Sequence, residues 1–145
     1  MKHRITVLIA HAESSPRRWL YRVLSRQRDL QIVGPARSDT ELIAILQKQK
    51  PRILLLDTRF IRRDGYSVVS HLRRCFPWTK VILLDKQYRN VQEVKAAQVG
   101  AHGYIGGKVE PATLQKAVRM TEAGETWMRR KTVSLILNEF SRMAS

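Results

Sequence analysis

The sequence of 145 residues lacks the features that mark secreted and membrane proteins. Its single cysteine, Cys75, excludes an internal disulfide and fits a reducing cytosol. No apolar run approaches the roughly 18 residues that a membrane-spanning helix needs. The first residues lead directly into a strand pattern and leave no room for a signal peptide. We therefore expect a cytoplasmic protein with no membrane partner.

Acidic residues are also scarce. Asp and Glu number 12 against 27 Lys and Arg, which gives a formal net charge of +15. A field this positive favours an acidic partner, either nucleic acid or the acidic surface of another protein. A solvated basic surface that serves solubility alone is the alternative interpretation. Part of the charge forms a basic patch on one face of a helical pattern, at Arg18, Arg22 and Arg26.

The residue patterns of metal, cofactor and enzyme sites are missing as well. The histidines lack metal-ligand spacing, and a chain with one cysteine is not expected to bind zinc. No glycine-rich loop follows the first strand pattern to hold a nucleotide phosphate. The serines have no His and Asp partners in a shared motif. We expect no metal, no cofactor and no enzymatic activity.

The sequence does contain a regular alternation of strand and helix patterns. Ile53 to Leu56 form an unbroken apolar run that stops at Asp57, as in a strand buried on both faces of a parallel sheet. Similar runs occupy residues 5–10, 30–34, 80–84 and 102–105. Helical patterns lie between them and begin near Ser14, Ser38, Gly65, Asn90 and Pro111. This order predicts an α/β fold, a doubly wound five-stranded parallel sheet flanked by helices.

Residues 126–145 follow a different pattern from residues 1–125. Val133, Ile136, Leu137 and Phe140 occupy one face of an expected C-terminal amphipathic helix. The segment is too short for a second domain, so we predict a domain over residues 1–125 and a linker with a helix over residues 126–145. An apolar face of this kind is costly to leave in water. We expect it to pack on the domain or on a second copy, which gives a homodimer.

Asp57 stands at the carboxyl end of a central strand, where open parallel sheets place their chemistry. With Asp64 and Gly65 in the loop and helix start that follow, this stretch resembles the phospho-acceptor region of a response-regulator receiver domain, of the NarL/FixJ-like (LuxR-type) branch. Further positions keep the register of that family: Gly100, Ala101, Gly103, Tyr104 and Pro111. The resemblance implies the flavodoxin/CheY-like receiver fold and makes Asp57 the phospho-acceptor position.

The resemblance also assigns the partners of a phospho-acceptor, and this chain departs from them. The acidic pair that holds Mg²⁺ corresponds to His11 and Ala12, and the carboxylate of Glu13 comes one residue too late. The hydroxyl that bonds the phosphoryl oxygen corresponds to Asp85. A carboxylate there should repel an incoming phosphoryl group rather than bind it. Both the metal ligands and the hydroxyl are therefore missing.

The lysine that neutralises the phosphoryl group corresponds to Gly107, although Lys108 is adjacent. Of the family's pocket, only the acceptor Asp57 is kept. Phosphoryl transfer depends on positioning and on neutralisation by a metal and a cation, and this pocket lacks both. Asp57 is then expected to be a buried or half-buried carboxylate held by a cation. The candidates for that cation are His11, Arg59, Lys86 and Lys108.

These departures predict a degenerate pocket that is not used for phosphorylation. The chain is then a pseudo-receiver of a bacterial response regulator and transcription factor, acting as a phosphorylation-independent dimerisation and signalling module. The resemblance implies a helix-turn-helix domain after Ser145, through which the protein contacts DNA. Two alternatives stay open. One is a phosphorylatable receiver that uses Glu13 and Lys108 as substitutes, and the other is a stand-alone adaptor that binds an acidic protein or nucleic acid.

Overall fold

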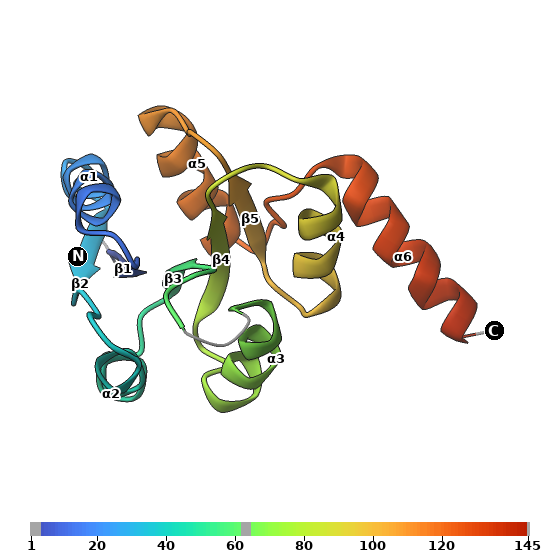
Figure 1. The fold of residues 1–145 in the computed structure, drawn as a ribbon, viewed down its shortest axis with the longest axis horizontal. Helices are drawn as coiled ribbons and strands as arrows, with labels where there is room; N and C mark the ends of the chain where they lie inside the picture. Colours follow the sequence, from blue (N-terminus) through green and yellow to red (C-terminus); the bar gives the residue numbers. More distant parts are fainter. Residues whose placement is uncertain (1–3, 62–64, 145) are drawn as a thin grey trace.

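The computed structural model of the chain describes residues 4–61 and 65–144. One parallel sheet has the strand order β2-β1-β3-β4-β5. Its strands are β1 (Ile5–Ala10), β2 (Leu30–Val33), β3 (Ile53–Asp57), β4 (Lys80–Asp85) and β5 (Gly103–Gly106). The helices are α1 (Ser14–Ser25), α2 (Asp39–Gln49), α3 (Gly65–Cys75), α4 (Asn90–Gln98), α5 (Pro111–Glu122) and α6 (Arg130–Ala144) (Figure 1). The predicted doubly wound α/β fold is confirmed.

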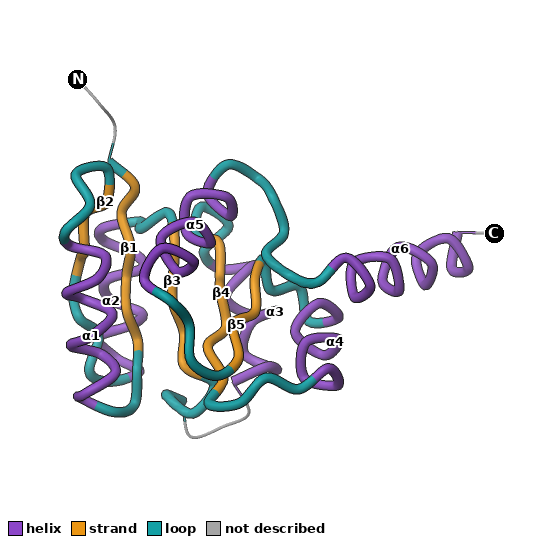
Figure 2. Tube along the Cα trace, turned by 90° about the horizontal axis from the view of Figure 1, so that it is seen from above, coloured by secondary structure: helices purple, strands orange, loops and turns teal. Residues whose placement is uncertain are grey.

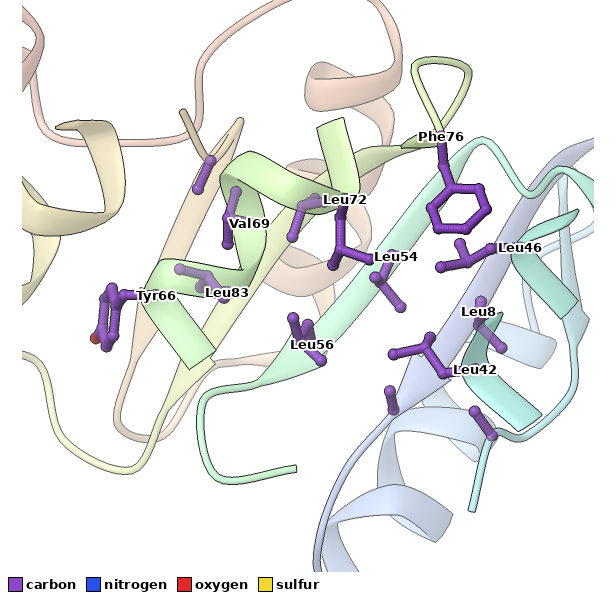
Figure 3. Close-up of a cluster of buried hydrophobic side chains, with 14 of the residues drawn as sticks. Leu8, Leu42, Leu46, Leu54, Leu56, Tyr66, Val69, Leu72, Phe76 and Leu83 are labelled. Carbon is purple, nitrogen blue, oxygen red and sulfur yellow. The ribbon is translucent and has the colours of Figure 1, made fainter. Parts of the chain in front are cut away.

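The sheet lies between two layers of helices, and each face has its own apolar core. Helices α2, α3 and α4 cover one face, where Leu46 of α2 and Leu72 of α3 pack in the same cluster as Leu54 of β3 (Figure 3). Helices α1 and α5 cover the other face, where Leu24 and Leu114 are fully buried. Because both layers close over the middle of the sheet, every residue of β3 is buried, including the carboxylate at its end.

Local sequence features set the helix starts. The Ser38 hydroxyl accepts the Glu41 N–H at 3.2 Å, which is one half of the expected capping box at the start of α2. The Glu41 carboxylate accepts the Arg37 N–H at 3.0 Å, one residue before the N-cap, in place of the Ser38 N–H of a full capping box. Pro111 opens α5. Gly65 opens α3, and a Cβ there would come within 2.6 Å of the Thr58 carbonyl oxygen. Glycine is therefore required at this position by the close approach of the backbone. Asp64, which carried part of the resemblance, lies outside the described residues.

Helix α6 confirms the expected C-terminal helix, but it extends away from the body of the domain (Figure 2). It packs beside α4. Val133 and Ile136 are half-buried, whereas Leu137 is 61% exposed and Phe140 is 67% exposed. The expectation that this apolar face packs on the domain is therefore wrong for Leu137 and Phe140, because α6 extends beyond the surface that α4 offers. Packing on a second copy stays a prediction.

The helices fall short of the requirements of a membrane span. None within residues 4–61 and 65–144 is long and apolar enough to cross a bilayer. The longest of them, α6, has 15 residues, and a span needs about 20.

A buried histidine gives the fold a testable pH dependence. His102 Nδ1 accepts the Val81 N–H at 3.1 Å, and burial lowers the pKa of His102 to about 4, with Arg73 and Lys80 adding to the effect. Between pH 6.5 and about 4, His102 is protonated in the unfolded chain but stays neutral in the folded chain. The free energy of unfolding therefore falls as the pH falls through this window. We expect the loss to be about 1 to 2 kcal/mol after allowance for partial exposure of the ring.

Substituting His102→Asn keeps a hydrogen-bond acceptor near the Val81 N–H but removes the titrating ring. Urea unfolding at pH 7.5 and pH 4.5 should therefore show a smaller loss of stability in this variant than in the parent chain. The exposed His71, changed to Asn, is the matched control and should leave the loss in place. Equal losses in the parent chain and the His102 variant would contradict the assignment.

Candidate functional site

Asp57 ends β3 in the centre of the sheet, and it is only 1% exposed. Its oxygens accept backbone N–H groups, Oδ2 from Ala12 at 3.1 Å and Oδ1 from Arg59 at 3.2 Å. The first donor belongs to the segment after β1 and the second to the segment after β3. Because β1 and β3 are neighbours in the sheet, both donors reach the carboxylate directly. Asp57 is thus a buried carboxylate whose oxygens already bond groups of its own chain.

The cation beside Asp57 is Arg59. Its Nε lies 3.5 Å from Asp57 Oδ1, and its Nη2 lies 2.8 Å from Glu13 Oε1. The guanidinium therefore joins a buried carboxylate to a half-exposed one. An unpaired buried charge costs several kcal/mol, so this contact offsets part of the cost of burying Asp57.

His11 lies close to Asp57 without acting as its cation. The ring is buried, and Nδ1 is 3.5 Å from Asp57 Oδ2. The same nitrogen accepts the Glu13 N–H at 3.1 Å, which requires a lone pair rather than a proton on Nδ1. Burial lowers the pKa of His11 below its ordinary value, although Asp57 acts in the opposite direction. At neutral pH His11 is therefore uncharged, and of the four expected cations Arg59 takes the role.

The residues around Asp57 do not fit a magnesium ion, which the receiver fold implies at this end of the sheet. Mg²⁺ requires oxygen ligands in octahedral geometry. Here the loop after β1 contributes an imidazole, a methyl group and the Glu13 carboxylate, and Glu13 is engaged by Arg59. No group of three or more His, Cys, Asp or Glu residues that could hold a metal occurs in the part of the chain that the structure describes. The positive charge at the site is the guanidinium.

Asp85 ends β4 and is held by two tyrosines. Its Oδ2 accepts the Tyr66 hydroxyl at 2.8 Å and the Tyr104 hydroxyl at 3.0 Å. Burial, together with these contacts to Asp85, raises the pKa of Tyr104 to about 12 and the pKa of Tyr66 further still, so both phenols stay protonated donors. One oxygen of Asp85 is therefore hydrogen-bonded to side chains of α3 and β5, and the expected repulsion between this carboxylate and a phosphoryl group stays a prediction.

The two tyrosines are the site residues that sequence reasoning missed. Each lies 19 positions from Asp85 in the chain, one on α3 and one on β5. Tyr104 stood out in the sequence only as part of a family pattern. Asp85 at the end of an apolar strand was visible, and a carboxylate that is partly removed from water needs donors. The sequence contains four tyrosines and does not say which of them meet it.

Gly107 and Lys108 do not supply the missing cation. Gly107 has a φ of +78°, and its N–H donates to the Asp85 carbonyl at 3.0 Å. A lysine at position 107 would be strained in this left-handed conformation. Lys108 is exposed and lines a groove of about 620 Å³ with Val109, Met120 and Trp127. Among the described residues, no contact joins Lys108 or Lys86 to Asp57.

The basic patch lies along α1, with Arg18 and Arg22 on the exposed face of the helix and Arg26 exposed as its C-cap residue. Within residues 4–61 and 65–144 none of the three forms an ion pair. By contrast, Arg119 of α5 forms a two-pronged ion pair with Asp29, at 2.7 and 2.9 Å. The structure does not bring the patch into the Asp57 site, so the two features are separate.

The doubly wound sheet, with a carboxylate at the carboxyl end of its central strand, is the arrangement of a receiver domain. The family model described as response regulator receiver domain matches residues 7–119. This range covers well over half of the chain, and the protein belongs to the response-regulator receiver family.

Individual relatives are distant. The chain is 26% identical over 141 residues to an uncharacterized transcriptional regulatory protein, YxjL, of Bacillus subtilis, and the match covers 97% of this chain and 65% of that protein. It is 26% identical over 121 residues to the response regulator protein VraR of Staphylococcus aureus, with 83% of this chain and 58% of that protein covered. The chain thus spans less than two thirds of the length of these relatives.

Solved structures share the fold at low sequence identity. The isolated receiver domain of RcsB from Salmonella enterica serovar Typhimurium, in the apo form, has a TM-score of 0.80 at 21% identity, over 93% of this chain and 99% of that chain. A two-component response regulator of the LuxR family from Aurantimonas sp. SI85-9A1 has a TM-score of 0.79 at 20% identity, over 95% of this chain and 99% of that chain. These likenesses support the receiver fold.

The contact between Arg59 and Asp57 can be tested by a double-mutant cycle. Arg59→Gln removes the charge next to a buried carboxylate, and we expect it to destabilise the chain by about 1 to 2 kcal/mol. In an Asp57→Asn background the same change should cost less, because the buried charge is gone. Denaturant unfolding of the four proteins at pH 7 gives the coupling energy, expected to be about 1 kcal/mol.

Arg18→Gln is the matched control, since Arg18 is exposed and its substitution should change stability by less than about 0.5 kcal/mol. A coupling energy near zero would show that Asp57 is stabilised by the backbone donors alone.

Proposed function

We propose that the chain is a phosphorylation-independent receiver module. The observation that carries this proposal is the state of Asp57, a buried carboxylate bonded by the Ala12 and Arg59 N–H groups and paired with the Arg59 guanidinium. An acceptor must present a free oxygen to a phosphoryl donor in line for transfer. Here the oxygens of Asp57 accept hydrogen bonds from the backbone of the same chain. The Arg59 guanidinium offsets the negative charge of the carboxylate.

The positions around Asp57 support the same conclusion. Transfer to a carboxylate requires a metal and a cation, because charge on the phosphoryl oxygens has to be neutralised. His11 and Ala12 offer no carboxylate, and Gly107 offers no ammonium group. Asp85 adds a negative charge where a hydroxyl would help. Restoring one of these groups would leave the others missing.

We further propose that the module acts within a transcription regulator in the cytoplasm. The relative from Bacillus subtilis is named a transcriptional regulatory protein, and the chain spans 65% of its length. A helix-turn-helix domain after Ser145 would supply contact with DNA, and α6 would be the connection to it. The receiver would then contribute assembly of a homodimer rather than a phosphorylation switch.

The test of phosphorylation independence is incubation of the chain with acetyl phosphate and Mg²⁺, followed by intact mass spectrometry. We expect no gain of a phosphoryl group, because Asp57 is enclosed and lacks the neutralising groups. A receiver domain with a complete pocket, treated in parallel, shows that the reagent is active. A stoichiometric gain that disappears in Asp57→Asn would sink the proposal and favour the phosphorylatable alternative.

That alternative requires Glu13 to replace a metal ligand and Lys108 to replace the missing lysine. Glu13 is engaged by Arg59 at 2.8 Å, and Lys108 lies in the groove beside Trp127. Both side chains would have to leave these places. The geometry therefore favours the phosphorylation-independent interpretation.

A second candidate function is favoured by the basic patch. Three exposed arginines at intervals of four residues along α1 and its C-cap repel one another by a few tenths of a kcal/mol per pair. A bound polyanion would relieve that repulsion, and the net charge of +15 would draw such a partner in. The partner is either DNA held by an adjoining domain or an acidic protein, as expected for an adaptor.

The DNA version predicts a salt-dependent contact. The protein with its adjoining domain is titrated on duplex DNA over a range of salt, in the parent form and with Arg18, Arg22 and Arg26 changed to Ala. If the patch touches phosphates, the variant should bind more weakly, and its log–log salt slope should be shallower by about 0.9 for each phosphate that it no longer neutralises. Lys48→Ala and Lys116→Ala, exposed on α2 and α5, serve as charge controls. Identical slopes in parent and variant would exclude DNA contact by the patch and leave an acidic protein partner or a basic surface that serves solubility alone.

A further inference from the structure

Helix α6 presents an apolar face that the described chain leaves largely uncovered. Residues three, four, seven and ten positions after Val133 complete one stripe along the helix, the α6 face: Val133, Ile136, Leu137, Phe140 and Met143. Its outer end is the most exposed, with Leu137 at 61%, Phe140 at 67% and Met143 at 83%. Several large apolar side chains side by side in water mark an interaction surface.

The base of α6 is fixed by a buried carboxylate. Glu93 of α4 is 1% exposed and accepts the Thr132 hydroxyl at the start of α6. The Arg129 N–H also donates to Glu93, at 3.3 Å, and the Tyr88 hydroxyl donates to it at 2.9 Å. A charge buried at this depth is stable only with its donors in place. The hydrogen bonds that Glu93 accepts therefore hold the start of α6 against α4.

The segment before α6 is fixed as well. The Tyr104 N–H donates to the Trp127 carbonyl at 3.0 Å, and the Trp127 N–H donates to the His102 carbonyl at 3.0 Å, so this segment extends the edge of β5. The Arg129 guanidinium lies 4.4 Å from the centre of the Tyr88 ring and donates to Asn90 at 2.8 Å. Because the start of α6 and the segment before it are both bonded to the domain, the direction in which α6 leaves the domain is fixed (Figure 1).

Charge indicates what covers the α6 face. The chain carries +15, so most of its surface repels a second copy. Between Thr132 and Ser141 the only charged residue is Glu139, whereas Arg130, Lys131 and Arg142 lie outside this stretch. The middle of α6 is therefore a place where two copies can approach without bringing arginines and lysines together. An acidic partner would find no cations there.

We infer that the α6 face is where two copies of this chain pair, helix against helix, with Glu93 as the residue that positions the helix. The inference rests on the proposed assembly function and names its surface. Apolar side chains at this spacing interdigitate in two-helix contacts. The anchor matters because an isolated helix of this length is marginal in water. Holding α6 in place before association reduces the ordering entropy that pairing would otherwise cost.

The test is sedimentation equilibrium of the whole 145-residue chain from micromolar to millimolar concentrations. We expect a monomer–dimer equilibrium whose dissociation constant rises by about tenfold or more in Leu137→Ser and in Phe140→Ser. Leu135→Ser is the matched control, because Leu135 is 42% exposed on the same helix but lies away from the α6 face. Its dissociation constant should stay within about twofold of the parent value.

The positioning role is tested by Glu93→Gln and by Thr132→Val, which alter the anchor without touching the α6 face. Each should weaken the dimer by about threefold or more, and hydrogen exchange of residues 132–141 should become faster in the monomer. Thr132→Val keeps the side-chain volume and removes one hydroxyl donor, so it separates loss of the anchor from unfolding. A dimer unchanged in both variants, with unchanged exchange, would show that Glu93 does not position the helix.

The other outcomes are also decisive. A parent chain that stays monomeric at all concentrations would overturn the inference, and the rest of a longer protein would then be the cover for the α6 face. A dimer that survives Phe140→Ser and Leu137→Ser would place the interface elsewhere. Neither result bears on whether Asp57 accepts a phosphoryl group, which the acetyl phosphate experiment decides. A parent chain that pairs through the α6 face and also gains a phosphoryl group on Asp57 would remove the proposed function and keep the surface.

Discussion

A carboxylate at the end of the most deeply buried strand constrains the whole carboxyl edge of the sheet. Asp57 is inside because helices cover both faces of β3, and a charge in that position has to find donors within the chain. The loop after β1 gives the Ala12 N–H, and the segment after β3 gives both the N–H and the guanidinium of Arg59. Once these groups are in place, the edge holds an internal ion pair rather than a metal site.

The same rule acts at two more acidic residues. Asp85 accepts hydrogen bonds from the hydroxyls of Tyr66 and Tyr104. Glu93 accepts hydrogen bonds from the segment around the start of α6. Like Asp57, these two carboxylates have their hydrogen-bond donors inside the fold.

The rings of Tyr104 and Tyr88 connect the hydrogen bonds of Asp85 with those of Glu93. Tyr104, bonded to Asp85, packs edge to face on Tyr88 at 5.7 Å between ring centres, and the Tyr88 hydroxyl bonds Glu93. A Cβ at Gly106 would come within 2.4 Å of the Tyr88 backbone, so the glycine lets this segment lie close to β5. The pocket edge and the base of α6 consequently form one packed unit. This gives the C-terminal helix a fixed relation to the site without any bound group.

The sequence by itself determined the fold class, because unbroken apolar runs such as 53–56 alternate with helical patterns whatever the surroundings. Together with the receiver resemblance it also predicted which pocket residues are missing, since His11 and Gly107 stand at the corresponding positions. Only the tertiary structure decided the partners: that Arg59 and not a lysine meets Asp57, that tyrosines hold Asp85, and that α6 leaves the domain. Strand and helix patterns depend on neighbours in the chain. A buried carboxylate takes its donors from whichever elements the sheet order brings beside it, and that order is a property of the packed whole.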